Sequence, residues 1–272
     1  MFGSKFFQVL ALATAVISPI SAVETQQSQS VTPYPLIGEW PINEFTATAF
    51  ADAFVAEAFA IWDSTGWRVI SSTDGILNEA KPVSGVFAAS GVDLTRAQAI
   101  VDVEAQKLFD LLITPKGYQL IDPASNPEDF SKPPLARYST QNWRGIGNAD
   151  KKYLKIDQAR VELPGLTKRQ FLVYNQVDQL TRIFVSKSIQ HEAIPGCSKY
   201  GGACYNASAV PIRVLNTFAV EVQPLATNAS QSVVRLINYA DLVGPEVPKE
   251  MMNAINAPFL VDMINRMRVA FP

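Results

Sequence analysis

The chain has 272 residues, of which 48% are hydrophobic, 10% aromatic and 18% charged, and its formal net charge is −2 at pH 7. This composition is globular and excludes a disordered or collagen-like chain. The sequence has no long run of Lys or Arg, so we expect no nucleic-acid partner. Two cysteines and one histidine, His191, cannot fill a four-ligand zinc site of Cys and His, and we expect neither a metal nor another cofactor.

The first 22 residues have the order of a secretory signal peptide. Lys5 supplies a positive charge, residues 6–17 form an apolar run, Pro19 ends that run, and Ser21-Ala22 offers a small-residue cleavage site. A single-span membrane anchor is the alternative, but the run is shorter than the roughly 20 residues that a bilayer requires. We therefore expect a signal peptide over residues 1–22 and a secreted, extracellular protein.

Two further features agree with export. Asn206 and Asn228 each begin an Asn-Ala-Ser triplet, the acceptor pattern for N-glycosylation, although such triplets also occur by chance. Cys197 and Cys204 flank a short segment that contains two adjacent glycines. In an oxidising compartment the leading interpretation is a disulfide that closes this loop, and two buried free thiols are the alternative.

After a lead segment over residues 23–44, the sequence predicts helices and strands in turn. Residues 45–62 combine aromatic residues with many alanines, which favours a helix with an aromatic face. Residues 67–72, 76–81 and 83–94 are short and separated by turn signals, and they predict a three-stranded meander. Residues 95–113 predict a second helix with Thr95 as its N-cap.

The second half of the chain is dominated by predicted strands. Residues 115–143 are irregular at their proline-rich centre, and a long closing helix with a kink at Pro258 is predicted over residues 248–271. This order indicates one domain over residues 45–272 in the α+β class, with a helix packed on an antiparallel sheet. The predicted strands between these two segments are residues 151–163, 171–177, 182–191, 212–223 and 232–241.

Several segments of this second half match the motifs of one known family. Residues 166–171 read LTKRQF, residues 182–191 read RIFVSKSIQH, Pro195 follows, and residues 211–214 read PIRV. The strongest match is residues 239–248, YADLVGPEVP, with the pattern Asp-x-x-Gly-x-(Ile/Leu)-Pro before the last helix. In this order the segments resemble the START family, the steroidogenic acute regulatory-related lipid-transfer domains. The resemblance covers about residues 45–271, and it implies structural roles for Arg169, as a partner in a turn ion pair, and for Asp241, as a cap at the helix entry.

The resemblance implies a helix-grip fold, in which a curved antiparallel sheet wraps around the long C-terminal helix and encloses an internal apolar cavity. Alternation along residues 171–177 places Phe171, Val173, Asn175 and Val177 on one face of their strand. Asn175 lies near the position where the sterol-binding branch of the family has a basic residue, and a backbone hydrogen bond at a strand edge is the alternative role for it. On the last helix Met252, Ile255, Phe259 and Met263 belong to an apolar stripe at helical spacing, which would face this cavity, and ordinary core packing is the alternative.

Three functions are compatible with this sequence. The first is a secreted monomer that holds one lipid, such as a sterol or phospholipid, and contacts a membrane surface transiently. The loop before the last helix, with Gly244, Pro245 and Pro248, would then be its gate.

The second is a cyclase- or hydrolase-like enzyme on the same fold, and the third is an extracellular interaction protein that has lost lipid binding. An enzyme would need an acid or base in the cavity. The candidates are His191, Asp157, Glu162 and Glu221, none of which lies in a motif, so we assign no catalytic residue.

We expect Cys197 and Cys204 to be bridged in the mature protein. Closing this short loop would stabilise the fold by about 2–3 kcal/mol in the chain-entropy model. Peptide mass mapping without reduction should recover both cysteines in one linked peptide. Free thiols at both positions would contradict the pairing and weaken the case for export.

Overall fold

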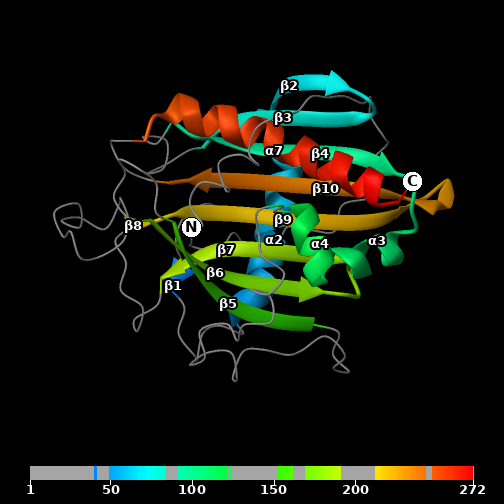
Figure 1. Ribbon diagram of the computed structural model, residues 1–272, viewed down its shortest axis with the longest axis horizontal. Coiled ribbons are helices and arrows are strands. Elements are labelled where there is room, and N and C mark those ends of the chain that lie inside the picture. Colours follow the sequence, from blue (N-terminus) through cyan, green and yellow to red (C-terminus); the bar gives the residue numbers. More distant parts are fainter. Residues whose placement is uncertain are drawn as a thin grey trace.

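The computed structural model describes residues 40–41, 49–83, 91–121, 123, 152–161, 169–190, 212–242 and 247–271. A single twisted sheet forms the middle layer, with α2 behind it and α7, α3 and α4 in front in the view of Figure 1. The helices are α2 (Ala49–Asp63), α3 (Ala105–Leu112), α4 (Pro115–Ile121) and α7 (Lys249–Ala270). The strands are β1 (Trp40–Pro41), β2 (Arg68–Thr73), β3 (Ile76–Pro82), β4 (Asp93–Val101), β5 (Lys152–Val161), β6 (Arg169–Asp178), β7 (Ile183–Gln190), β8 (Ile212–Arg213), β9 (Leu215–Leu225) and β10 (Asn228–Asp241).

The ten-stranded sheet is antiparallel along its main path, with the order β2-β3-β4-β10-β9-β7-β6-β5. Two short strands lie off this path and pair in parallel, β1 with β7 and β8 with β6. The predicted antiparallel α+β fold with a long closing helix is confirmed. The pairing of β4 with β10 joins an N-terminal group of strands to a C-terminal group.

Helix α2 is amphipathic, as predicted, but is described only from Ala49 onward. Its buried residues recur at intervals of three and four, so they form one stripe that faces the sheet. This stripe consists of Phe54, Glu57, Ala58, Ile61 and Trp62. The stripe therefore contains one carboxylate among apolar side chains.

The predicted helix over residues 95–113 is wrong in its first part, and the third strand of the predicted meander begins at Asp93, later than the predicted 83–94, of which residues 84–90 lie outside the described residues. Residues 93–101 form β4 instead, and burial alternates along it, with Thr95, Ala97, Ala99 and Val101 buried. Alternation with period two is the signature of a strand, and the two alanines concealed it because alanine also favours helices. Thr95 is therefore no helix cap, and its hydroxyl donates a hydrogen bond of 2.9 Å to the Asn238 carbonyl.

Only residues 105–112 of the predicted second helix are helical, as α3, and α4 lies where an irregular segment was expected. The five strands predicted for the second half are confirmed with small shifts, except that residues 212–223 form two strands, β8 and β9. The closing helix is confirmed as α7, with Pro258 inside it.

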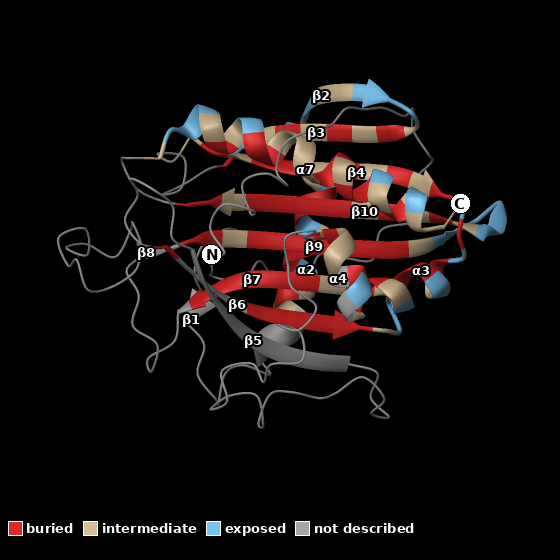
Figure 2. Cartoon of the chain, viewed as in Figure 1, coloured by how far each residue is buried: buried red, intermediate tan, exposed pale blue. Residues whose placement is uncertain are grey.

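The described residues form two core clusters that meet at the sheet. The central strands β10, β9, β7 and β6 are coloured mostly as buried in Figure 2. One cluster packs α2 on the sheet and includes Phe54, Ile61 and Tyr174. The other packs α3 and the C-terminal half of α7 and includes Phe109 and Met263. Neighbouring residues of β9 enter different clusters, because successive side chains of a strand point to opposite faces.

A buried ion pair lies at the centre of the α2 side. The Lys187 ammonium donates to a Glu57 carboxylate oxygen at 2.5 Å and to the Thr217 hydroxyl at 3.0 Å. Both charged side chains are almost completely removed from water. Burial raises the pKa of Glu57 to about 7, against the attraction of Lys187, and burial also lowers the pKa of Lys187.

We predict that either partner of this pair is costly to remove alone. Glu57→Ala would leave a buried, unpaired ammonium and should lower the free energy of unfolding by about 3–5 kcal/mol, whereas the double replacement E57L/K187M should be close to neutral. Chemical denaturation of the single and double variants measures the coupling. Arg68→Ala is the control, because Arg68 and Asp93 form a more exposed pair, which should contribute less than about 1 kcal/mol. Single losses that simply add in the double variant would contradict the coupling.

Candidate functional site

The side of the sheet that faces α7 is divided into an apolar end and a polar end. At the apolar end Val177, Phe218, Leu236 and Ala99 belong to the core cluster of α3 and α7. This cluster lies under the C-terminal half of α7, which contributes Met263 among others.

The polar end has buried amides and hydroxyls at positions that are neighbours across the strands. Asn175 lies opposite Ser186, Ser186 opposite Phe218, and Phe218 opposite Asn238. In the next row the Ser188 hydroxyl accepts a hydrogen bond of 3.0 Å from the backbone N–H of Asn216. We call the five polar residues of these rows, Asn175, Ser186, Ser188, Asn216 and Asn238, the polar rows.

Side-chain packing closes the two sides of the central strands to different degrees. On the α2 side, Tyr174, Lys187 and Ala219 are 0% exposed. On the α7 side, the adjacent Asn175 and Ser186 keep 7% and 8% of their surface, and Asn216 is only partly buried. These three residues therefore keep a small accessible surface, although they lie in the middle of the sheet.

The N-terminal half of α7 is held to the sheet mainly by asparagine side chains. Asn253 accepts from the Asp93 backbone N–H at 2.7 Å and donates to the Gly91 carbonyl at 3.0 Å. Asn256 accepts from the Asn238 amide at 3.2 Å and donates to the Ala240 carbonyl at 3.0 Å.

Next to Pro258, the Asn78 amide of β3 donates to the Ala257 carbonyl at 2.7 Å. Its own carbonyl oxygen, Oδ1, is buried and has no hydrogen-bond partner. The attachment of this half therefore combines these hydrogen bonds with the buried side chains of Met252 and Ile255.

The C-terminal half of α7 is attached differently. Five of its residues are fully buried apolar side chains, namely Leu260, Val261, Met263, Ile264 and Met267. Arg266 donates to the Leu120 carbonyl at 2.7 Å, and Arg268 donates to the carbonyls of Asp74 and Ile100 at 2.7 and 3.0 Å. Pro258 separates this tightly packed half from the asparagine-bound half.

The structure distributes the predicted cavity residues over both clusters. Asn175 lies in the polar rows, and Val177, Phe259 and Met263 pack in the cluster of α3 and α7. Phe171 and Met252 pack instead in the cluster that contains α2. Val173 is partly buried on β6, and Ile255 is buried on α7.

Other predicted site residues fall at the margins of the site. Pro248 is the N-cap of α7 and is exposed, and Asn228 is exposed at the start of β10. The remaining ones, Gly244, Pro245, Cys197, Cys204 and Asn206, lie outside the described residues.

The candidate acids and bases do not meet in one place in the described part of the chain. Glu221 lies on the α2 side, where burial raises its pKa, and its carboxylate accepts from Arg235 at 3.4 Å and from Gln223 at 3.2 Å. Asp157 lies opposite Val173 in the register of β5 with β6. His191 and Glu162 lie outside the described residues. In the described ranges no group of three or more His, Cys, Asp or Glu side chains could hold a metal ion.

Arg169 ties the site to the segment that enters α7. It is 0% exposed at the start of β6, and its Nε donates to the Leu242 carbonyl at 2.6 Å. Asp241, one residue earlier, is buried and accepts from the Tyr239 hydroxyl at 3.4 Å. The residues that the family motifs singled out therefore fix the approach to the last helix.

The comparisons with known proteins find the fold but no sequence relative. No protein-family model and no curated protein matches the chain. Among solved structures, human StAR-related lipid transfer protein 5 is similar at a TM-score of 0.53 and 14% identity, over 84% of this chain and 97% of that one. The lipid transfer and protein localization domain of human StarD13 has a TM-score of 0.46 and 17% identity, over 85% and 98%. A STAR-related lipid transfer protein from Xanthomonas axonopodis has a TM-score of 0.42 and 12% identity, over 76% and 98%.

The first of these likenesses establishes the fold. The chain has the START helix-grip fold, an antiparallel sheet with a long C-terminal helix across one side. No helix of the described residues is long and apolar enough to cross a membrane.

Proposed function

We propose that this chain is a lipid-binding and lipid-transfer protein that holds one hydrophobic ligand between the sheet and α7. The observation that carries the proposal is the unequal closure of the sheet. On the α2 side Tyr174, Lys187 and Ala219 are 0% exposed, whereas on the other side Asn175 and Ser186 keep 7% and 8% of their surface and Asn216 is partly buried. Human StAR-related lipid transfer protein 5 has a similar fold, which supports the same proposal.

The division of this side into two ends suits an amphiphile. An apolar body would lie against Phe218 and the methionines of α7, whose flexible thioether chains adapt to acyl chains or rings. A polar group would meet the amides and hydroxyls of the polar rows, where a buried hydroxyl or carbonyl of the ligand needs hydrogen-bond partners.

Entry and exit require an opening, and the two attachments of α7 indicate where it forms. The half before Pro258 has fewer buried apolar side chains, Met252 and Ile255, and is also held by hydrogen bonds, which water or a membrane surface can replace. The half after Pro258 buries apolar side chains, whose exposure costs more. The first half would lift at a membrane surface, on the rigid base that the second half provides.

We also propose that the chain is exported and works outside the cell as a monomer. The order of charge, apolar run and small residues over residues 1–22 supports export. Asn228 is exposed at the β9–β10 turn, which is compatible with a glycan there.

Native mass spectrometry of the protein purified from its own secretion route tests ligand binding directly. We expect an equimolar lipid to remain bound and to be recovered by solvent extraction. A protein that carries no lipid, and takes none up from vesicles, would contradict the proposal.

We predict that Ser186→Trp blocks the ligand. Ser186 lies in the polar rows with residual accessible surface, so an indole would occupy the space proposed for the ligand. Uptake of a fluorescent lipid from vesicles should fall at least tenfold. The matched control is Ser72→Trp on the exposed strand β2, which should bind as the wild type does. Circular dichroism must show both variants folded, and normal uptake by a folded Ser186→Trp protein would contradict the site.

We predict that Asn253→Ala accelerates lipid exchange. It removes two hydrogen bonds from the asparagine-bound half of α7, so the opened state should become several-fold more populated. Stopped-flow transfer between vesicles measures the rate. The control is Arg266→Ala, which removes hydrogen bonds from the other half and should lower stability without faster transfer. Equal acceleration by both variants would refute an opening restricted to the first half.

A further inference from the structure

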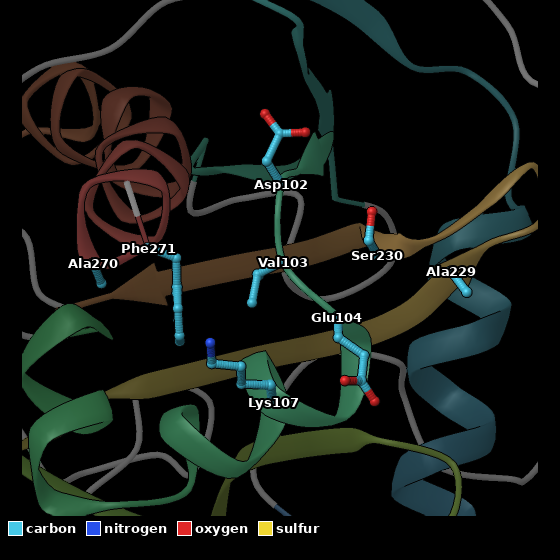
Figure 3. Close-up of a pocket in the computed structure, with 8 residues that line it drawn as sticks. All are labelled: Asp102, Val103, Glu104, Lys107, Ala229, Ser230, Ala270 and Phe271. Atoms are coloured by element: carbon cyan, nitrogen blue, oxygen red, sulfur yellow. The ribbon is translucent and has the colours of Figure 1, made fainter.

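A surface groove lies beyond the C-terminal end of α7, at the opposite end of that helix from Asn253. It has a volume of about 820 Å³ and is formed by three separate parts of the chain (Figure 3). These are the connection from β4 into α3, the start of β10, and the end of α7. Its lining residues are Asp102, Val103, Glu104, Lys107, Ala229, Ser230, Ala270 and Phe271.

The floor of the groove is continuous with the protein core. Val103 is buried in the cluster of α3 and α7, and Phe271 packs against the same cluster while remaining partly exposed. The backbone N–H of Phe271 donates to the Arg268 carbonyl at 3.2 Å, which fixes the residue just after the helix. With Ala229 and Ala270, these side chains form an apolar patch in the groove, beside the polar residues Asp102, Glu104, Lys107 and Ser230.

One cation faces this apolar patch. The Lys107 ammonium lies 5.4 Å from the centre of the Phe271 ring, and Lys107 has no ion-pair partner among the described residues. The two carboxylates of the lining do not neutralise it. Asp102 accepts a hydrogen bond from Gln231, and in Figure 3 the carboxylates of Asp102 and Glu104 both point away from the ammonium.

We propose that this groove is a second binding site, for an anionic single-chain amphiphile such as a fatty acid carboxylate. The carboxylate would pair with Lys107, and the chain would lie on Phe271 and Val103. A cationic ligand fits less well, because Lys107 already occupies the ring that would attract it. The volume is within the usual range for small-molecule sites. The site is separate from the space between the sheet and α7 that the proposed function uses.

Sodium octanoate, kept below its micelle concentration, is the probe for this site. In amide NMR spectra of the mature protein we expect saturable shifts at Val103, Lys107 and Phe271. Octan-1-ol should bind about three- to fivefold more weakly, because it has no charge for an exposed ammonium to pair with. Octyl phosphate should bind comparably if any anionic head suffices.

Lys107→Gln and its control Lys116→Gln test the role of the cation, and Phe271→Ala tests the role of the ring. Lys107→Gln should weaken octanoate about three- to fivefold and leave octan-1-ol unchanged, whereas Lys116→Gln, at an exposed lysine of the adjacent α4, should change neither. Phe271→Ala should weaken both ligands. An unchanged octanoate affinity in Lys107→Gln, or shifts that spread over the surface without saturation, would overturn the proposal and leave an adventitious additive only.

The failure of this site can be told from failure of the proposed function. Octanoate binding at the groove should be the same in Ser186→Trp as in the wild type, because the two positions lie in different parts of the fold. Loss of octanoate binding in Ser186→Trp would place octanoate between the sheet and α7. That outcome would overturn the groove site while supporting the ligand space of the proposed function.

Discussion

The closure of one side of the sheet by α2 is the constraint on which the rest of the structure depends. The helix covers β7 and its neighbours with a stripe of apolar side chains, and the Glu57–Lys187 pair lies in the middle of that contact. A buried ion pair adds little net stability, but it penalises every misaligned docking of the helix, which would leave a charge unpaired. Because this side is fixed, any ligand space has to form on the other side of the same strands.

That other side is covered by a helix with two kinds of contact, and the difference follows from its sequence. Residues before Pro258 include Asn253 and Asn256, whose amides reach backbone groups of β4 and β10. Residues after it are Leu, Val, Met and Ile at buried positions. Proline removes one hydrogen bond of the helix and so weakens the link between the two halves. One helix can therefore be both an anchor and a movable cover.

Strand and helix periodicity predicted most of the fold, and it failed where residue types were ambiguous. The strands of the second half are rich in β-branched residues, so they were predicted nearly to the residue. In residues 95–101, Ala97, Gln98 and Ala99 are also common in helices. The alternation of buried and partly buried side chains along this strand becomes visible only once its partner β10 is known. The cavity stripe of α7 was predicted from spacing, yet the asparagines that hold the helix were not. A polar residue at a position where the pattern expects a core residue could have predicted these buried polar contacts. Glu57 in its apolar stripe and Asn238, two residues after Leu236, are such positions.

The junction of β4 with β10 determines when the protein can fold. The Thr95 hydroxyl and the Asn238 carbonyl are 143 residues apart in sequence, and Arg268 reaches back 194 residues to the Asp74 carbonyl. Contacts of such separation carry a large loop-closure cost and slow the search for the native state. The two groups of strands can therefore join only after almost the whole chain has been synthesised. Until then β4 has an unpaired edge, which is a risk for aggregation during synthesis.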